Sequence, residues 1–337
     1  MNLADIGEEV LIEHLMKEFS LPTSSEGLVV GVGDDAAVLD LGGPMHTIIT
    51  TDMLAEGTHY RLDLVTPYQL GWKSVASNIS DIAAMGGLPT WTLISLGLKP
   101  DTDIGFVDEI YRGLVECAER FESKIIGGDT ISVRQDSVIG ICQMGKIEPN
   151  LIARRSGASP GDRILVTGWL GNSRAGLELL LRFGMEEAAQ LHGWLVSQHL
   201  TPIPRVLEAR AAVATNAVRA MMDISDGLGA DLPKLCKASG VGAVVYASKL
   251  PISSDLQSAA ERLGMDTLEL VVGGGEDFEL LMAVGPHDVK KVIKAIKEGT
   301  GTRVTEIGEF TEDKTVEIVM PDGSKRPLWG GWEHFKK

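Results

Sequence analysis

The segment Leu28-Val-Val-Gly-Val-Gly-Asp-Asp-Ala-Ala-Val-Leu-Asp-Leu41 decides between two fold classes for the first part of the chain. Within it, Gly31-Val-Gly-Asp-Asp-Ala36 matches the G-x-G-x-x-A pattern of dinucleotide-binding folds. That pattern needs a helix next, so that the helix N-terminal amides meet a pyrophosphate. Here a strand-like run follows, and Asp34 and Asp35 would repel phosphate. The segment therefore predicts two short strands joined by a Gly-Asp-Asp turn and excludes a dinucleotide-binding fold.

Strand-like and helix-like segments alternate along the rest of the chain in two groups. In the first group, helices are expected over 8–19, 66–85 and 103–122, and strands over 28–32, 36–41, 47–51, 91–98, 124–126 and 137–146. After a turn-rich break at 152–161, helices are expected over 175–183, 186–198, 205–214 and 228–238, and strands or apolar runs over 163–167, 220–224, 242–247, 278–284 and 315–319. We expect a mixed α/β protein of two domains, residues 1–148 and 149–337.

The charge balance limits the classes of partner. The 337 residues contain 47 acidic and 31 basic side chains, a formal charge of −16. Nucleic acids and anionic membrane surfaces are recognised mainly through Lys and Arg, so neither is an expected partner. A small anionic substrate would need a local remedy, such as a metal ion or a few arginines.

Targeting and redox signals are weak but agree with one another. The N-terminal residues lack the basic-then-apolar layout of a signal peptide. The longest uncharged run, Ile82–Leu98, is too short to span a membrane and contains glycine and proline. Three widely spaced cysteines indicate neither a disulfide framework nor a zinc site. The sequence predicts a cytoplasmic protein.

Aspartates directly follow several apolar segments, although Asp is depleted in strands. They are Asp34, Asp35, Asp52, Asp129, Asp223 and Asp226, and a further group, Asn78, Ser80 and Asp81, interrupts an apolar helical stretch. A single Asp-Gly pair is usually a turn or a cap, but carboxylates on neighbouring strand ends repel one another unless cations hold them. Oxygen ligands suit Mg²⁺ rather than zinc. The residues alone predict a Mg²⁺-dependent enzyme that handles phosphate, and they specify no substrate.

A series of motifs along nearly the whole chain carries a resemblance. The motifs are Gly33-Asp-Asp-Ala36, Thr50-Thr-Asp-Met53, Glu56-Gly-Thr-His59, the stretch from Lys73 to Gly86, Gly127-Gly-Asp-Thr130, Arg155-Ser-Gly-Ala158, Gly161-Asp162, Val166-Thr-Gly168, Asp223-Ile-Ser-Asp-Gly227, Gly274-Gly-Glu-Asp-Phe-Glu-Leu280 and Trp332-Glu-His-Phe335. In this order they resemble the thiamine-monophosphate kinases. That family belongs to a superfamily with aminoimidazole ribonucleotide synthetase, selenophosphate synthetase and a hydrogenase maturation protein.

The resemblance implies a fold and a reaction. The fold would be an N-terminal mixed-sheet domain that pairs with its twin in a homodimer, followed by a C-terminal α/β domain. The reaction would transfer the γ-phosphate of ATP to thiamine monophosphate, giving thiamine diphosphate, with several Mg²⁺ ions. The acceptor is a phosphate that is largely ionised at neutral pH, so no general base and no covalent phospho-enzyme are expected. Mg²⁺ would bring the two anions together in line.

The resemblance also implies the site residues. Magnesium ligands are expected at Asp35, Thr50, Thr51, Asp52, Asp81, Asp129, Asp223 and Asp226. ATP contacts are expected at Gly128, Asp129, Arg155 and Ser225, and substrate contacts at His59, Glu276 and Trp332. An extra glycine in Gly273-Gly-Gly275 is expected to loosen the loop that carries Glu276.

Rival functions remain open at this point. A selenophosphate synthetase would offer a reactive Cys near the N-terminus, whereas the first cysteine here is Cys117. The maturation protein would end in a Cys, and this chain ends in Lys337. An aminoimidazole ribonucleotide synthetase-like enzyme shares the fold, although Glu56-Gly-Thr-His59 and Trp332 favour thiamine chemistry. A non-catalytic nucleotide or thiamine-phosphate binding protein would lack at least one carboxylate, and all matching positions are filled.

Overall fold

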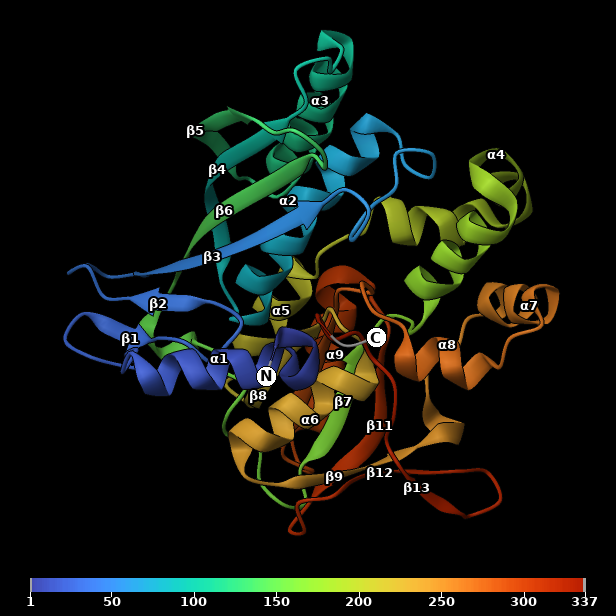
Figure 1. The fold of residues 1–337 in the computed structure, drawn as a ribbon. Helices are drawn as coiled ribbons and strands as arrows, with labels where there is room; N and C mark the ends of the chain where they lie inside the picture. The colour runs from blue at the N-terminus through green and yellow to red at the C-terminus, as the bar shows by residue number, and fades with distance from the viewer. Residues whose placement is uncertain (1, 336–337) are drawn as a thin grey trace.

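Two mixed β-sheets with helices packed against them make up the computed structural model, which describes residues 2–335 (Figure 1). The N-terminal sheet has the strand order β1-β2-β3-β6-β4-β5. Its strands are β1 (Leu28–Val30), β2 (Ala37–Leu39), β3 (His46–Ala55), β4 (Leu88–Leu98), β5 (Lys124–Ser132) and β6 (Val138–Ile147). The pair β4 and β5 is parallel and the other pairs are antiparallel, so the sheet is mixed.

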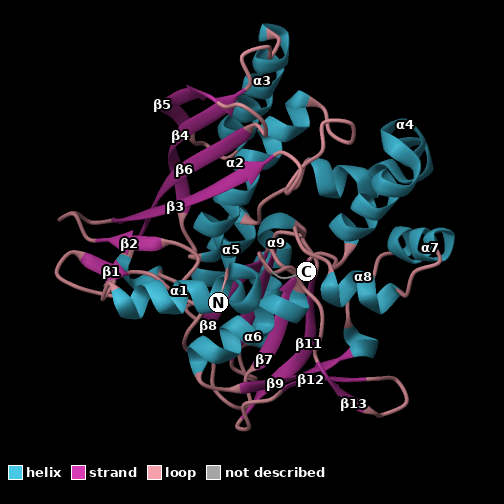
Figure 2. Cartoon of the chain, viewed as in Figure 1, coloured by secondary structure: helices cyan, strands magenta, loops and turns pink. Residues whose placement is uncertain are grey.

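Helices α2 (Pro67–Ala84) and α3 (Ile104–Arg120) cover one face of the N-terminal sheet, whereas in the part of the chain that the structure describes no helix lies over the opposite face (Figure 2). Helix α2 begins at a capping box, in which the Thr66 side chain accepts from the Gln69 N–H at 3.2 Å. The Gln69 side chain accepts from the Thr66 N–H at 2.9 Å, and Pro67 supplies the first-turn proline. Nearly all of α2 is buried, which makes it the central helix of the molecule.

Side-chain alternation along β3 separates the covered face from the open face. Ile48 and Leu54 are buried on the helix side, whereas Met53 is 61% exposed on the open side. On β4, Trp91 is 45% exposed on the same open side. The N-terminal sheet therefore presents a partly apolar face that no described element of this chain covers.

The C-terminal sheet has the strand order β13-β12-β9-β11-β7-β10-β8. Its strands are β7 (Arg163–Thr167), β8 (Val218–Ile224), β9 (Gly242–Tyr246), β10 (Glu279–Val284), β11 (Val304–Thr311), β12 (Val316–Val319) and β13 (Lys325–Pro327). The remaining helices are α1 (Leu3–Glu18), α4 (Asn172–Leu200), α5 (Val206–Val213), α6 (Leu228–Ser239), α7 (Ser254–Leu263), α8 (Thr267–Gly273) and α9 (Val289–Thr300). Short 3₁₀ turns lie at Pro149–Leu151 and Ala247–Lys249. Strand β10 is buried along its whole length between β7 and β8.

Helix α2 also joins the two sheets. It contacts β3, β4 and β6 on one side, and β8, α4 and α5 on the other. The Trp72 indole N–H donates to the Pro202 carbonyl at 2.8 Å, and Ser80 reaches Asp223 on β8. Side chains from both halves of the chain thus pack into one continuous core around α2.

The predicted fold class, a two-domain mixed α/β fold, is confirmed. The break between the helices predicted over 175–183 and 186–198 is confirmed, because the backbone of α4 is non-helical at Gly184; a second interruption, at His192, was not predicted. Strand β5 continues to Ser132, well past the predicted end at 126. The boundary between residues 148 and 149 stays a prediction. Within residues 2–335, no helix combines the length and apolarity needed to cross a membrane.

Candidate active site

Three buried or half-buried carboxylates meet between the two sheets. Asp35 follows β1 in the Gly-Asp-Asp turn, Asp81 lies in the last turn of α2, and Asp223 lies near the end of β8. One oxygen from each lies within 4.8 Å of the others. Oδ2 of Asp35 is buried and accepts no hydrogen bond from the described residues. An orphaned carboxylate oxygen that faces two further carboxylates is the donor set of a hard cation site.

Hydroxyl and guanidinium groups fix the orientation of these carboxylates. Thr50 on β3 donates to Asp81 at 2.7 Å, and Ser80 donates to Asp223 at 2.5 Å. Arg155 contacts Oδ1 of Asp35 through Nη2 at 2.8 Å and through Nε at 3.2 Å. The second oxygen of Asp35 thereby stays directed away from the arginine.

The carboxylates are held in an unfavourable electrostatic environment. Burial raises the pKa of Asp81 well above its usual value, and the charges of Asp52 and Asp223 add to the rise. Burial and the neighbouring Asp35 likewise raise the pKa of Asp223. The pKa of Asp52 rises to about 6, because it is buried and faces Asp226. Without an added positive charge, ionising all of these groups together costs folding free energy.

Asp52 and Asp226 border the cluster from β3 and from the loop before α6. The backbone N–H of Asp52 donates to the Asn78 side chain at 2.9 Å. Lys234 contacts Asp226 at 2.5 Å and Asp231 at 2.9 Å. The basic side chains Arg155 and Lys234 thus lie at opposite borders of the acidic site, on Asp35 and on Asp226.

The structure does not bring Thr51, Gly128 and Asp129 to the cluster within one chain. Thr51 lies on the open face of β3, and its hydroxyl donates to the Ile141 carbonyl at 2.9 Å. Gly128 and Asp129 are exposed on the edge strand β5. In register, Asp129 aligns through β4 and β6 with Met53 on β3. Asp129 is therefore three inter-strand spacings, about 14 Å, from Met53, the neighbour of Asp52 in the chain.

The predicted substrate residues converge at the other end of α2. Glu276 accepts from the Lys73 ammonium at 2.7 Å. The His59 ring lies 5.2 Å from the His334 ring, and Trp332 packs edge-on against His334 at 5.8 Å. The backbone N–H of Trp332 donates to the Asp226 carbonyl at 2.9 Å, so the C-terminal segment connects this region with the carboxylate cluster.

Backbone contacts connect the loop that carries Glu276 to its neighbours, and the expectation that an extra glycine loosens this loop stays a prediction. The backbone N–H of Glu276 donates to the Ser225 carbonyl at 2.6 Å. A Cβ on Gly275 would lie 2.7 Å from that same carbonyl oxygen, so glycine permits the close approach of the two loops. Asp277 accepts the N–H groups of Gly171 and Ser173 at the start of α4.

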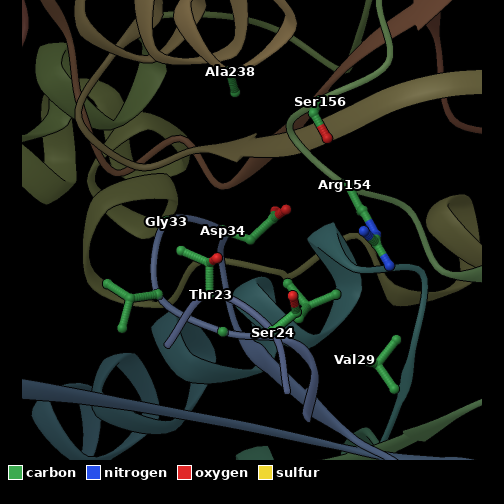
Figure 3. Close-up of a pocket in the computed structure, with 11 residues that line it drawn as sticks. Thr23, Ser24, Val29, Gly33, Asp34, Arg154, Ser156 and Ala238 are labelled. Carbon is green, nitrogen blue, oxygen red and sulfur yellow. The ribbon is translucent and has the colours of Figure 1, made fainter. Parts of the chain in front are cut away.

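A pocket of about 260 Å³ opens beside the carboxylate cluster (Figure 3). Thr23, Ser24 and Asp34 line it from the N-terminal half, and Arg154 and Ser156 line it from the start of the C-terminal half. Arg154 is exposed and forms no ion pair with the described residues. The pocket therefore combines an available guanidinium with direct proximity to Asp34, the neighbour of Asp35.

Several residues of the site have no role in the sequence-based prediction. Lys73 lies on α2, eight residues or about two helical turns before the predicted ligand Asp81. Lys234 lies eight residues after Asp226, and only the turn into α6 brings the two together. His199 and Ser173 come from opposite ends of the interrupted α4, and no sequence signal pairs them.

Comparison with known proteins places this site in a family. Residues 33–147 match the N-terminal domain of AIR synthase related protein, and residues 159–321 match the C-terminal domain of that protein. The chain is 34% identical to the thiamine-monophosphate kinase of Aquifex aeolicus over 99% of this chain and 100% of that protein. It is 37% identical to the enzyme of the same name from Mycobacterium tuberculosis, over 99% of this chain and 93% of that protein.

The fold agrees with solved structures. A structure of AaThiL complexed with AMPPCP and TMP superposes with a TM-score of 0.85 at 34% identity, over 99% of both chains. The hydrogenase maturation protein HypE in complex with ATP shares the fold at a TM-score of 0.71 and 19% identity, over 98% of both chains. The chain therefore belongs to the AIR synthase-related family and, within it, to the thiamine-monophosphate kinases.

Proposed function

We propose that this enzyme transfers the γ-phosphoryl group of ATP directly to thiamine monophosphate, giving thiamine diphosphate without a covalent phospho-enzyme. The observation that supports this most strongly is the cluster of Asp35, Asp81 and Asp223 with its orphaned buried oxygen. Such a set fits Mg²⁺, which prefers carboxylate oxygen and shares its coordination with substrate phosphates. The similar AaThiL structure is described as complexed with AMPPCP and TMP.

The chain's own residues bind and orient rather than exchange protons. We assign Asp35, Asp52, Asp81, Asp223 and Asp226 to holding several Mg²⁺ ions, which would neutralise the phosphates of both substrates when bound. Thr50 belongs to the same proposed set, as the hydroxyl that orients Asp81. An ionised phosphate acceptor needs no general base, so alignment and charge neutralisation account for the reaction.

ATP contacts are proposed at the junction of the two sheets. Arg155 lies beside Asp35, and the backbone carbonyl of Ser225 lies in the loop between β8 and α6. Arg154, exposed in the pocket next to Asp34, is a further candidate for an ATP phosphate. Arginine offers a planar pair of donors that suits phosphate oxygens.

The acceptor is proposed to lie along α2. Lys73 and Asp81 are eight residues apart, so about 12 Å of helix separates the Glu276 end from the carboxylate cluster. Glu276 and the rings of His59 and Trp332 would then contact the heterocycles while the phosphate reaches the metal ions. Burial, together with His334, lowers the pKa of His59, so its ring is neutral at pH 7. Nδ1 accepts from Ala55, which leaves the proton on Nε2 as a donor.

A homodimer is proposed through the open face of the N-terminal sheet. That face exposes Met53 and Trp91, and the edge strand β5 has a neighbour on one side only among the described strands. Pairing two such faces would bury the apolar side chains and cover the edges. We also propose that the partner subunit's Asp129 and Gly128 complete the site, since neither reaches Asp52 within one chain. Cytoplasmic location stays a prediction.

A product assay tests the proposed function. Purified protein is mixed with ATP, Mg²⁺ and thiamine monophosphate, and thiamine diphosphate is separated by chromatography. We expect thiamine diphosphate and ADP in equal amounts. Release of ADP without thiamine diphosphate, or with another phosphate acceptor only, would contradict the proposal.

Mixing inactive variants tests the proposed dimer. Asp129→Asn and Asp81→Asn are each expected to be inactive alone. If the partner subunit's Asp129 completes the site, mixed dimers contain one site with both native aspartates and regain part of the activity. No regain after subunit exchange, verified by mass spectrometry of the mixed dimer, would place both residues in one subunit's site.

A further inference from the structure

The buried Lys73 forms an ion pair with Glu276, the carboxylate that we propose contacts the substrate. The side chain of Lys73 is only 4% exposed, whereas that of its partner Glu276 is 31% exposed. Within this ion pair, it is therefore mainly the carboxylate of Glu276 that is exposed to solvent. A ligand that enters from solvent meets the carboxylate of Glu276 before it meets the ammonium of Lys73.

His199 lies close to both Lys73 and Glu276. Its Nε2 lies 3.5 Å from the Lys73 ammonium, which can only donate, so Nε2 acts as the acceptor. The proton of the neutral ring is then on Nδ1, which lies 3.0 Å from Ser173 Oγ and 3.4 Å from Glu276 Oε2. Lys73 thereby sets the tautomer of His199. Lys73 donates to Oε2 of Glu276, whereas Nδ1 of His199 donates to Ser173 Oγ and lies close to the same carboxylate oxygen.

The two oxygens of Glu276 consequently differ. Lys73 and His199 both lie against Oε2, whereas Oε1 accepts no hydrogen bond from the residues that the structure describes. The Glu276 backbone adopts a left-handed conformation with φ of 61°, which is held by its N–H bond to Ser225. Backbone and side chain are both fixed, so Oε1 has a defined position.

Aromatic rings lie close to the ion pair of Glu276 and Lys73. Electrostatic interaction with Glu276 acts to raise the pKa of His59, and that with Lys73 acts to lower it, so His59 lies close to the pair. His59 contacts His334, and His334 contacts Trp332. An ionised carboxylate beside tilted and edge-on aromatic rings suits a flat cationic heterocycle that also carries an amino donor.

We propose that Lys73 and His199 are positioning residues, which hold Glu276 ionised and in one place so that Oε1 selects an acceptor with a cationic ring. This rests on the proposed function and adds the basis of acceptor selectivity to it. Lys73 takes no part in phosphoryl transfer, because it lies at the opposite end of the α2 segment from Asp81. Its effect reaches the substrate only through Glu276.

Steady-state kinetics on the full-length enzyme test this proposal. Lys73→Met, His199→Asn and Glu276→Gln are compared with the control Lys291→Met, which removes a lysine bonded to the Thr215 carbonyl far from the site. We expect the first three to raise KM for thiamine monophosphate about 10-fold to 100-fold, as for a misplaced binding group. KM for ATP and kcat should change by less than about threefold, and Lys291→Met should match wild type.

A double variant separates positioning from general damage. If Lys73 acts through Glu276, then Lys73→Met adds less than about twofold in KM to Glu276→Gln, because the two changes remove one interaction. Lys73→Arg keeps the positive charge and should recover part of the affinity. Wild-type enzyme should also prefer thiamine monophosphate over a neutral thiazole phosphate without the pyrimidine, and Lys73→Met should reduce that preference.

The outcomes distinguish this proposal from the proposed function. If wild-type protein makes thiamine diphosphate but Lys73→Met and His199→Asn keep wild-type KM for the acceptor, the positioning role is wrong and the function stands. Equal rises in KM for ATP and acceptor, or full additivity in the double variant, would also overturn it. If Lys73→Met fails to fold, His199→Asn provides the same test, because it removes Nε2, the acceptor of the Lys73 ammonium, while its amide keeps a donor for Ser173 near the position of Nδ1.

Discussion

Two regions along helix α2, which we call the Asp81 end and the Lys73 end, differ in how their carboxylates are stabilised. At the Asp81 end, carboxylates face one another, and Oδ2 of Asp35 is buried without a hydrogen bond from the described residues. At the Lys73 end, the carboxylate of Glu276 already has its ammonium partner at 2.7 Å. Burial acts to raise the pKa of Glu276, but Lys73 and then His199 outweigh it, and the pKa is lowered. The pKa of Asp81 is raised instead.

This difference shows at which end the protein itself supplies the charge partner of the carboxylate. The Lys73 end is organised before any ligand arrives, as expected for a surface that selects one substrate. In our proposal, the Asp81 end becomes favourable only when cations bind, so its binding energy depends on ligands that bring or attract metal ions. One helix would thus join a preorganised recognition site to a site that metal ions complete.

Among the changes that test this comparison, we expect Asp81→Asn to have the largest effect on activity. We expect turnover to fall on the order of 10³-fold or more, because metal-ion stabilisation of phosphoryl transfer is worth several kcal/mol. The metal-free variant should be at least as stable as wild type, since one of several repelling carboxylates is gone. Product formation and thermal unfolding in EDTA measure the two effects.

The exposed Asp101→Asn is the matched control for Asp81→Asn and should leave both activity and stability unchanged. An active Asp81→Asn enzyme would remove Asp81 from the proposed metal ligands. A variant that is inactive and strongly destabilised would mean that the carboxylate is structural, and the two ends of α2 would then differ less than proposed.

Metal addition should stabilise the protein through the Asp81 end alone. At a Mg²⁺ concentration about 100 times the dissociation constant, binding to the native state adds about 2.7 kcal/mol, or roughly 5 °C in Tm. Scanning fluorimetry with EDTA and with increasing Mg²⁺ measures this shift. Asp81→Asn should lose most of it, whereas Lys73→Met should keep it. Equal Mg²⁺ responses in wild type and Asp81→Asn would contradict the assignment.

The smallest expected effect is a pH dependence at the Lys73 end. Burial and the nearby Lys73 lower the pKa of His199 to about 3, whereas an unfolded His titrates near 6.5. The unfolded state therefore binds more protons between these values, and stability is lost as the pH falls below about 6.5, at roughly 1 kcal/mol per pH unit. His199→Asn cannot lose this contribution.

Thermal unfolding of wild type and His199→Asn from pH 8 to pH 4.5 checks the sign. The Tm of the variant relative to wild type should rise as the pH falls, because titration of all other groups is common to both proteins. Parallel Tm curves over this range would show that His199 is protonated in the folded protein, and its assignment as the neutral acceptor of Lys73 would be wrong.

Much of the fold follows from local sequence patterns. The capping residue Thr66 with Pro67 predicts where α2 begins, and the structure starts the helix at Pro67. The turn after β1 is followed by β2, as the strand-like run after Asp35 predicts. The break at Gly184 between the two predicted helices is confirmed, whereas the interruption at His192 could not be predicted, because a histidine in a helical pattern is no signal for a break.

The acidic residues show how far the site could be predicted. Their positions after apolar segments predicted a metal cluster, and Asp35, Asp81 and Asp223 do meet although they are far apart in sequence. Lys234 and His199 were missed, because each acts across a turn or between helix ends, where spacing along the chain carries no signal. Asp129 lies outside the cluster of one chain, and only the strand order shows this.

The sequence by itself determined the residue chemistry: the acidic excess, the order of the motifs and the amphipathic periodicity of individual elements. These are local properties, since they depend on residue type and on neighbours a few positions away. Only the tertiary structure decided which charges are paired. Lys73 and Glu276 lie about 200 residues apart in sequence and form an ion pair, whereas Asp35 and Asp81 lie close together although both are acidic. Both outcomes depend on burial and on distances through space, because these set the strength of electrostatic interactions.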